Sequence, residues 1–419
     1  MDARAIDCDQ ISAVQIVEGW VYFRSRAGVA RLATWLLLLF GLLMMLPQSV
    51  WADETDPASI RIGYLSHAWV RPPVLSNLDE HPEDEGRIGA VLGIEDNNTT
   101  GRFTGQSFEL IERVVDRVGL LAALRDFAET GIQFVLLDLQ SDAMHDLMAS
   151  DLPQNMLFFN VSSPDRSLRN QCMTNLLHTA LSTDMRTDAL AQFLIKKRWS
   201  KWFVIEGQRP EDRLYGEAIA RSARKFGAKI VEQKDWPGNF DARRAAYAEI
   251  PLFTQGVKYD VLWVADEIGD FGDYMLFQTY DPKIAAGTQG LVANGWGRPI
   301  EQWGAAQLQE RFEDLANRWM RPRDYAAWVA VRSIGEAALR VQSGDLQNIR
   351  TYLNSEDFQI AGFKGRKMSF RNWSGQMRQP VPVMWERAVV AQPPLDGFLH
   401  QHTELDTLGL DRPESACTR

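Results

Sequence analysis

The sequence predicts an α/β protein with two lobes, each built on a parallel sheet that helices cover on both faces. Short apolar segments alternate with amphipathic segments of about 10 to 15 residues, which is the pattern of βαβ units. This alternation occurs twice, in residues 60–161 and again in residues 184–265. The chain has 419 residues, 45% of them hydrophobic. This length is greater than that of a typical domain with a single hydrophobic core. Two α/β lobes follow from these observations.

In the first block, strands are expected where apolar residues alternate with polar ones or run together. These strands are 60–65, 108–111, 132–139 and 157–161. One helix is expected from about Gly86 to Asn98, and a second over 120–129, closed by Gly131. The segment 69–85 is rich in proline and acidic residues and is expected to be a loop.

The second block repeats the pattern and is followed by a longer helical section. Its strands are expected at 202–205, 229–232 and 261–265, and its helices at 184–197, 214–226 and 241–254. Later in the chain we expect, in order, a strand at 290–294, helices at 305–319 and 324–342, and strands at 363–370 and 381–389.

Residues 1–52 are predicted to be a cleavable secretory signal. Three arginines precede the uncharged run Leu32–Leu46, Pro47 ends that run, and Ala52 is the small residue at the cleavage position. As a helix the run would span about 22 Å, less than the roughly 30 Å of a bilayer core. A retained membrane anchor is the alternative, and the long stretch before the arginines leaves the true translation start open. The mature protein is expected outside the cytoplasm.

The charge of the chain argues against two classes of partner. The formal net charge is −10, and no cluster of basic residues is present. Nucleic acids and anionic membrane surfaces attract basic patches, so neither is expected as a partner. Past the signal, no second apolar run is long enough to cross a bilayer.

Two cysteines remain after removal of the signal, which takes Cys8 with it. In an oxidising compartment, Cys172 and Cys417 are expected to pair and to pin the C-terminal tail to the body of the protein. Two unpaired thiols are the alternative.

The chain carries none of the common catalytic or cofactor motifs. G-x-S-x-G, the Walker A loop, G-x-G-x-x-G, H-E-x-x-H and C-x-x-C are all absent. His400 and His402, with Asp406 nearby, could chelate a metal, but a solvated tail is the favoured interpretation of this polar segment. The acidic loop 266–273 lacks the spacing of a calcium loop. We therefore expect a binding protein rather than an enzyme, with no metal and no cofactor.

Polar and small residues follow the predicted strands. Ligands of open parallel sheets bind beyond the carboxyl ends of the strands, where hydroxyls, amides and backbone N–H groups hold small polar molecules. The residues at these ends are Ser66, Gln140, Ser141, Asp142, Ser162 and Ser163 in the first block, and Glu206, Gly207, Asp266 and Asn294 in the second. Ordinary capping of loops is the alternative role for each of them.

Residues 89–98 (GAVLGIEDNN), followed by Gly101, Gly105 and Phe108-Glu109-Leu110, resemble a known family. They are similar to the first helix and second strand of type I periplasmic substrate-binding proteins of the leucine/isoleucine/valine-binding class, which serve ABC importers. Later segments resemble the subfamily associated with alcohol dehydrogenase systems dependent on pyrroloquinoline quinone. These are Leu168-Arg169 with Cys172, 177–179, 197–199, 324–328, 363–365 and 373–380.

The resemblance implies two Rossmann-like lobes, joined by three crossovers, that close around a ligand in the cleft between them. The first lobe would comprise 59–182 and 295–345, and the second 183–294 and 346–395, with 396–419 as a C-terminal tail.

The resemblance also implies which residues contact the ligand. Ser141, Ser162 and Ser163 would do so from the first lobe, Tyr215 and Asp266 from the second, and Asn294 and Trp296 from near the third crossover. The Ser162-Ser163 pair replaces the Ala-Thr pair usual in the family. No clear equivalent exists for the acid that holds the ligand's ammonium group, a task for which Asp266 is the candidate.

The function implied is that of a monomeric periplasmic protein that captures a small polar metabolite for ABC permease subunits and is linked to alcohol oxidation. Two rivals stay open. One is a receptor of the same fold that reports ligand occupancy without transport. The other is an enzyme or accessory factor of the quinoprotein system.

Overall fold

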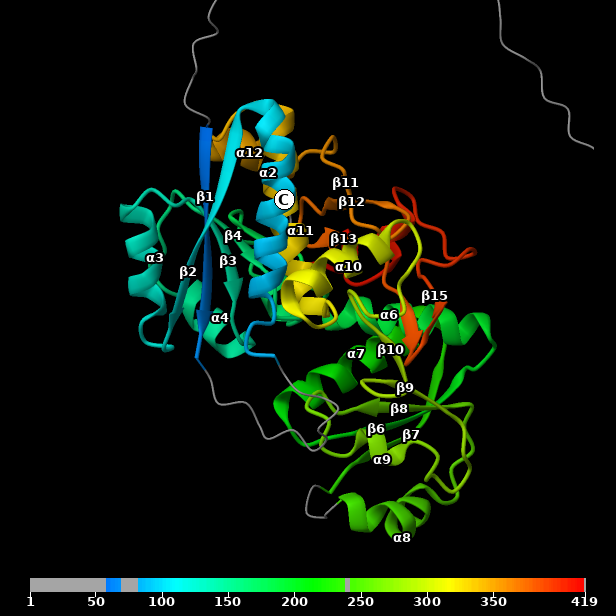
Figure 1. Cartoon of the computed structure of the whole chain (residues 1–419). Helices are drawn as coiled ribbons and strands as arrows, with labels where there is room; N and C mark the ends of the chain where they lie inside the picture. The colour runs from blue at the N-terminus through cyan, green and yellow to red at the C-terminus, as the bar shows by residue number, and fades with distance from the viewer. Residues whose placement is uncertain (1–57, 69–81, 238–241, 418–419) are drawn as a thin grey trace, which may run out of the picture. The chain divides into compact units, whose positions relative to one another are not determined.

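The computed structural model describes residues 58–68, 82–237 and 242–417 (Figure 1). The predicted secretory signal therefore lies outside the described residues. Within the described ranges, no helix combines the length and the apolar character needed to cross a bilayer.

The first sheet has five strands in the order β2-β1-β3-β4-β5, and all of its neighbours pair in parallel. The strands are β1 (Ala58–His67), β2 (Gln106–Val115), β3 (Phe134–Asp138), β4 (Leu157–Asn160) and β5 (Leu176–His178). Successive side chains enter different cores, as the period of two in a strand requires. Leu136 joins the core shared with α2 and α11, whereas Leu137 joins the core shared with α3 and α4.

Figure 1 shows these two pairs of helices on opposite faces of the first sheet. The helices of this part are α2 (Arg87–Thr104), α3 (Leu120–Glu129), α4 (Ser141–Met148), α5 (Arg166–Arg169), α10 (Ala305–Ala316) and α11 (Pro322–Val341). The close approach of α2 to α11 depends on Gly89, where a Cβ atom would lie 1.9 Å from the carbonyl oxygen of Asp324. A side chain at this position would push the two helices apart.

The second sheet has seven strands in the order β15-β14-β10-β9-β8-β6-β7. They are β6 (Lys201–Glu206), β7 (Lys229–Asp235), β8 (Val261–Ala265), β9 (Ile284–Gly287), β10 (Leu291–Ala293), β14 (Val383–Trp385) and β15 (Ala388–Ala391). β14 and β15 are antiparallel to their neighbours, and the other strands are parallel. Trp202 and Phe203 again enter cores on opposite faces.

Helices cover both faces of the second sheet as well. α6 (Thr183–Lys196) and α7 (Pro210–Phe226) pack on one face, while α8 (Ala242–Thr254) and α9 (Gly272–Met275) pack on the other. α7 ends at Gly227, whose left-handed φ of 74° is the conformation that glycine adopts without strain.

The segment after α11 forms a third sheet of three strands, in the order β11-β12-β13, and also adds two strands to the second sheet. α12 (Leu346–Leu353), β11 (Ile360–Ala361), β12 (Lys367–Phe370) and β13 (Met377–Arg378) share the core of α2 and α11, whereas β14 and β15 extend the second sheet. The limits of the lobes stay a prediction, and this packing supports assigning 346–377 to the first lobe.

The predicted strand 363–370 is wrong over its first half. Phe363 and Gly365 have positive φ values of 54° and 70°, so the backbone turns there and a strand forms only from Lys367. The motif Phe363-Lys364-Gly365 is therefore a tight turn rather than extended chain.

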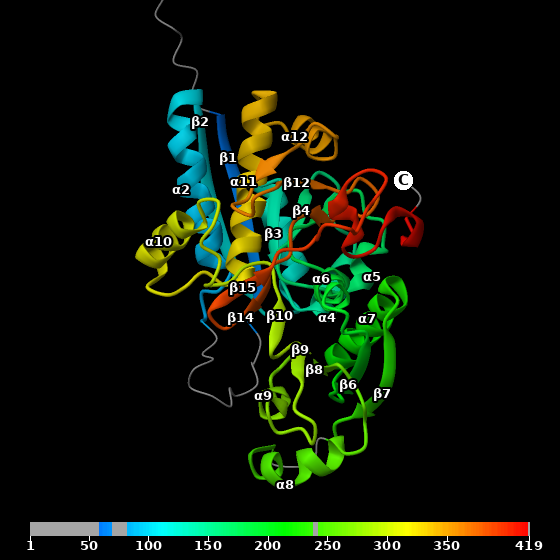
Figure 2. The same cartoon turned by 90° about the vertical axis from the view of Figure 1, so that its right-hand side faces the viewer.

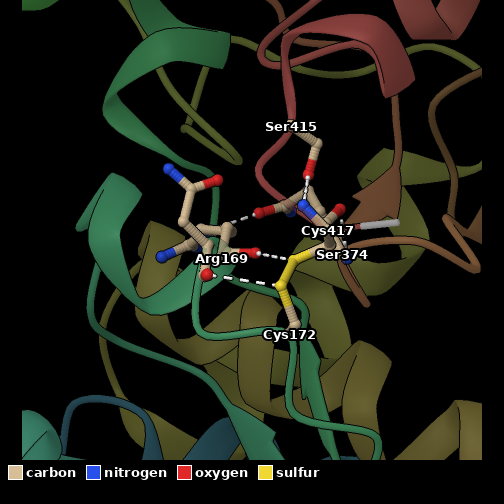
Figure 3. Close-up of a disulfide and its surroundings, with 7 residues drawn as sticks. Arg169, Cys172, Ser374, Ser415 and Cys417 are labelled. Atoms are coloured by element: carbon tan, nitrogen blue, oxygen red, sulfur yellow. Dashed lines mark hydrogen bonds between the residues drawn. A yellow bond between two sulfur atoms is a disulfide. The ribbon is translucent and has the colours of Figure 1, made fainter. Parts of the chain in front are cut away.

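The C-terminal segment, drawn red in Figure 2, contains two 3-10 helices, η1 (Glu404–Thr407) and η2 (Arg412–Glu414). It contacts residues attached to both sheets. Glu414 pairs with Arg221 of α7 at 2.7 Å, and Cys417 is joined to Cys172, which precedes β5, by a disulfide. Figure 3 shows this disulfide beside Arg169 and Ser415. The tail is thus fixed at points far apart in sequence.

Candidate functional site

A cleft of about 880 Å³ lies at the carboxyl ends of β1, β3 and β4. The first turn of α7, from the second sheet, contributes Pro210, Glu211 and Leu214 to its lining. Six residues predicted from the strand ends also line it, namely Ser66, Gln140, Ser141, Asp142, Ser162 and Ser163. The structure thus brings the predicted residues of the first lobe together, because the parallel strands that precede them end at one edge of one sheet.

Three of the four serines at this edge form hydrogen bonds within the protein. The Ser162 hydroxyl donates to the Leu139 carbonyl at 2.8 Å and accepts from the Leu139 N–H at 2.9 Å. The Ser141 and Ser163 hydroxyl oxygens lie 2.7 Å apart. These bonds tie the loop after β3 to the loop after β4 and fix the shape of the cleft.

Asn160, at the end of β4, was not among the predicted site residues. Its side-chain oxygen accepts the backbone N–H groups of Ser162 at 3.2 Å and Ser163 at 2.8 Å. Its amide nitrogen lies 3.0 Å from Nδ1 of His178. Burial lowers the pKa of His178 well below its ordinary value, and nearby Arg169 lowers it further, so this imidazole stays neutral. Asn160 therefore occupies two backbone donors of the loop after β4.

In the lining of the cleft, the side chains of Tyr64, Asp138 and Arg323 pair with one another. The Tyr64 hydroxyl donates to Asp138 at 2.6 Å, and Arg323 lies 3.5 Å from the same carboxylate. Burial, and secondly the charge of Asp138, raise the pKa of Tyr64 well above its usual value. The phenol therefore remains a protonated donor to Asp138.

His67 and Ser66 have unused hydrogen-bonding capacity. His67 lines the cleft and is only 8% exposed, with Nε2 lying 3.3 Å from the side-chain oxygen of Gln140. Its Nδ1 is buried and has no hydrogen-bond partner. The Ser66 hydroxyl makes no hydrogen bond within the described part of the chain. Because Nδ1 is enclosed by protein atoms, a ligand atom in the cleft does not reach it, and the Ser66 hydroxyl is the free group that lines the cleft.

Tyr215, predicted from the second lobe, does not line this cleft. It is fully buried, the Arg186 guanidinium lies 4.9 Å from its ring centre, and its hydroxyl has no partner. Burial raises the pKa of Tyr215 well above its ordinary value. Arg186 also pairs with Glu267 at 2.7 Å. Glu267 follows β8 directly after Asp266 and, like Tyr215, is not part of the cleft lining.

Asp266 holds the loop after β8 in place. Its two carboxylate oxygens accept four backbone N–H groups, from residues 269 to 272, at 2.7–3.0 Å. The side chain is 1% exposed and is not part of the cleft lining. In this structure its hydrogen-bonding capacity serves the loop.

Asn294 and Trp296 lie outside the lining of the cleft as well. The Asn294 N–H donates to the carbonyl of Pro382 at 3.3 Å. Trp296 is 1% exposed and stacks on Tyr325, with ring centres 4.5 Å apart and planes inclined by 7°. Trp296 thus belongs to the hydrophobic core of the first sheet.

The histidines of the tail are engaged with their neighbours. Nε2 of His400 lies 3.0 Å from Asp411, and its Nδ1 accepts the backbone N–H of His402 at 3.2 Å. The described residues contain no group of three or more side chains arranged to hold a metal ion.

Replacing Asp266 with alanine is expected to lower the free energy of unfolding by about 2–4 kcal/mol, because four backbone donors lose their acceptor. Asp270→Ala is the matched control, since Asp270 lies in the same loop and forms only an exposed pair with Arg209. It is expected to cost less than about 1 kcal/mol. Urea denaturation of both variants measures the difference, and equal stabilities would refute the structural role of Asp266.

Comparison with solved structures confirms the predicted fold class, that of type I periplasmic binding proteins. A periplasmic binding protein from Burkholderia mallei has 15% identity and a TM-score of 0.61, with 86% of this chain and 98% of that chain covered. A branched-chain amino acid ABC transporter ligand-binding protein from Burkholderia xenovorans LB400 has 15% identity and a TM-score of 0.63, with 77% and 89% covered.

A third structure is a branched-chain amino acid transporter substrate-binding protein from Streptococcus pneumoniae in complex with isoleucine. It has 15% identity and a TM-score of 0.56, with 80% of this chain and 98% of that chain covered. No family model and no curated protein sequence matches the chain. At these identities the likeness establishes the fold.

Proposed function

We propose that the protein is a periplasmic solute-binding protein that captures a small polar metabolite and delivers it to ABC permease subunits. The observation that carries this proposal is the cleft of about 880 Å³, which has a polar lining at the strand ends of the first sheet and receives the first turn of α7 from the second. Clefts at such edges are where open parallel sheets bind ligands. The fold shared with binding proteins of ABC transporters supports the same function.

The proposed location is the periplasm, reached through a signal cleaved after Ala52. The basic flank and the apolar run Leu32–Leu46 support export. We further propose that the protein acts as a monomer and is linked to an alcohol dehydrogenase system dependent on pyrroloquinoline quinone. The support for that link is the sequence resemblance at 168–172, 324–328 and 373–380.

The test is to purify the protein from the periplasm, unfold it, and identify any released metabolite by mass spectrometry. We expect a metabolite in stoichiometric amount, which raises the melting temperature when it is added back to refolded protein. The absence of both a released metabolite and a thermal shift across amino acids, alcohols and carboxylates would refute ligand capture.

Transport and sensing are separated by a second measurement. Ligand-loaded protein should stimulate ATP hydrolysis by the cognate permease in membrane vesicles. Binding of the metabolite without stimulation would instead support a receptor that reports occupancy.

A further inference from the structure

We propose that the ligand of this cleft is an uncharged molecule rich in hydroxyl groups, such as a small polyol or sugar, rather than an amino acid. The inference rests on the proposed function, since it takes the cleft to be the ligand site. It follows from which charges and hydrogen-bonding groups in the lining are already paired and which are free.

A ligand carboxylate would find no unpaired arginine or lysine among the described residues of the lining. The backbone N–H groups of Ser162 and Ser163 are taken by Asn160. The two arginines of the lining are also paired, Arg323 with Asp138 at 3.5 Å and Arg87 with Glu112 at 3.6 Å. Burial of an unpaired carboxylate is costly, so an anionic group is disfavoured.

The charge of the lining opposes an anion further. Its carboxylates outnumber its arginines, and one of them, Asp142, occupies the first turn of α4, where a helix otherwise attracts anions. The acidic residues are Glu83, Glu85, Asp138, Asp142, Asp165 and Glu211.

A ligand ammonium group would find no free carboxylate in the inner part of the cleft. Asp138 is held by Arg323 and Tyr64, and Asp165 lies 2.8 Å from His145. Two further carboxylates of the cleft lining, those of Glu83 and Glu211, have no ion-pair partner among the described residues. Both side chains are exposed at the rim of the cleft. A cation bound inside would have to displace an existing partner.

Asp266 is the residue predicted to hold an ammonium group of the ligand, and the next acidic residue in the chain is Glu267. Glu267 is also paired, since it lies 2.7 Å from Arg186. Arg186 in turn lies against the ring of Tyr215, so the guanidinium is held from two sides. This pairing leaves Glu267 neutralised by the protein itself.

The free group at the end of β1 suits a hydroxyl. The Ser66 hydroxyl lines the cleft and makes no hydrogen bond within the described residues. A ligand hydroxyl both donates and accepts, so it can pair with this serine as donor or as acceptor. A neutral hydroxylated ligand gains this bond without the cost of burying an unpaired charge.

The experiment uses ligand-free protein, prepared by unfolding and refolding, and six probes measured by isothermal titration calorimetry. Myo-inositol, xylitol and glucose are the neutral probes, and L-leucine, succinate and putrescine supply the zwitterion, the anion and the cation. We expect saturable binding of at least one neutral probe and no binding of the three charged probes.

Variants locate the binding. Ser66→Ala is expected to weaken binding of the neutral probe by about 3- to 10-fold, the value of one hydrogen bond, without changing the melting temperature of the free protein. Ser59→Ala, at the exposed opposite end of β1, is the matched control and should bind as the unaltered protein does.

The outcomes distinguish three failures. Binding of leucine, succinate or putrescine would overturn the proposed ligand class while leaving the solute-binding function in place. Failure of all six probes, together with the absence of any co-purified metabolite, would overturn both. Neutral binding that is unchanged by Ser66→Ala would overturn the assignment to this cleft.

Discussion

Removing the disulfide between Cys172 and Cys417 is expected to lower the free energy of unfolding by about 2–5 kcal/mol. The two cysteines are separated by 245 residues, so the bond closes a long loop and restricts the unfolded chain strongly. It also holds Cys417, near the end of the tail, beside Arg169, whose carbonyl oxygen lies 3.5 Å from the Cys417 sulfur (Figure 3). Urea denaturation of the Cys172→Ser/Cys417→Ser double variant measures the effect.

The single variants are the control for this experiment. Cys172→Ser and Cys417→Ser each break the same bond, so each should reproduce the loss measured for the double variant. Thiol titration of the unfolded, unreduced protein that starts at Asp53 should find no free group. Two free thiols, or a double variant as stable as the parent, would contradict the structural role of the disulfide.

Replacing Arg371 with methionine is expected to cost about 3–5 kcal/mol of unfolding free energy. Arg371 is 1% exposed and donates hydrogen bonds to Asp406 at 2.8 Å and to the carbonyls of Leu405, Leu408 and Leu410 at 2.6–3.1 Å. Methionine preserves much of the apolar stem, so the loss reports the missing guanidinium. The carbonyls of Leu408 and Leu410 would then lose the donor that Arg371 supplies, whereas the Leu405 carbonyl would keep the N–H of Leu408.

Arg366→Met is the matched control for Arg371→Met. Arg366 also pairs with the tail, through Glu404, but both side chains are more than a third exposed. An exposed pair of this kind contributes about 0–1 kcal/mol. If urea denaturation gives Arg371→Met and Arg366→Met the same stability, the buried arginine does not anchor the tail as described.

The sequence was a good guide to elements that are long enough to show a period. The predicted helix Leu120–Glu129 and strand Val261–Ala265 coincide with α3 and β8. The sequence missed α4, β5, β9 and α12, which have 3 to 8 residues each. Such short elements offer too few residues for a pattern to emerge, and tertiary contacts decide whether they form.

The residues of the candidate site could also be predicted only in part. The rule that ligands bind beyond the carboxyl ends of parallel strands selected Ser66, Gln140 and Ser141, which the structure places in the cleft. The same rule selected Asp266, whose carboxylate is occupied by the backbone of its own loop. Position along a strand predicts where a residue lies, but it does not predict which of its atoms remain free.

By itself, the sequence determined the α/β class, the order of its principal strands and helices, and the polar character of one sheet edge. These properties depend on local periodicity and on residues near one another in the chain. Only the tertiary structure decided which polar groups pair, as Asn160 does with two backbone donors and Arg186 with Glu267. Arg186 and Glu267 are 81 residues apart, and their pairing depends on how α6 packs beside the end of β8. The balance of paired and free groups in the cleft is therefore a property of packing.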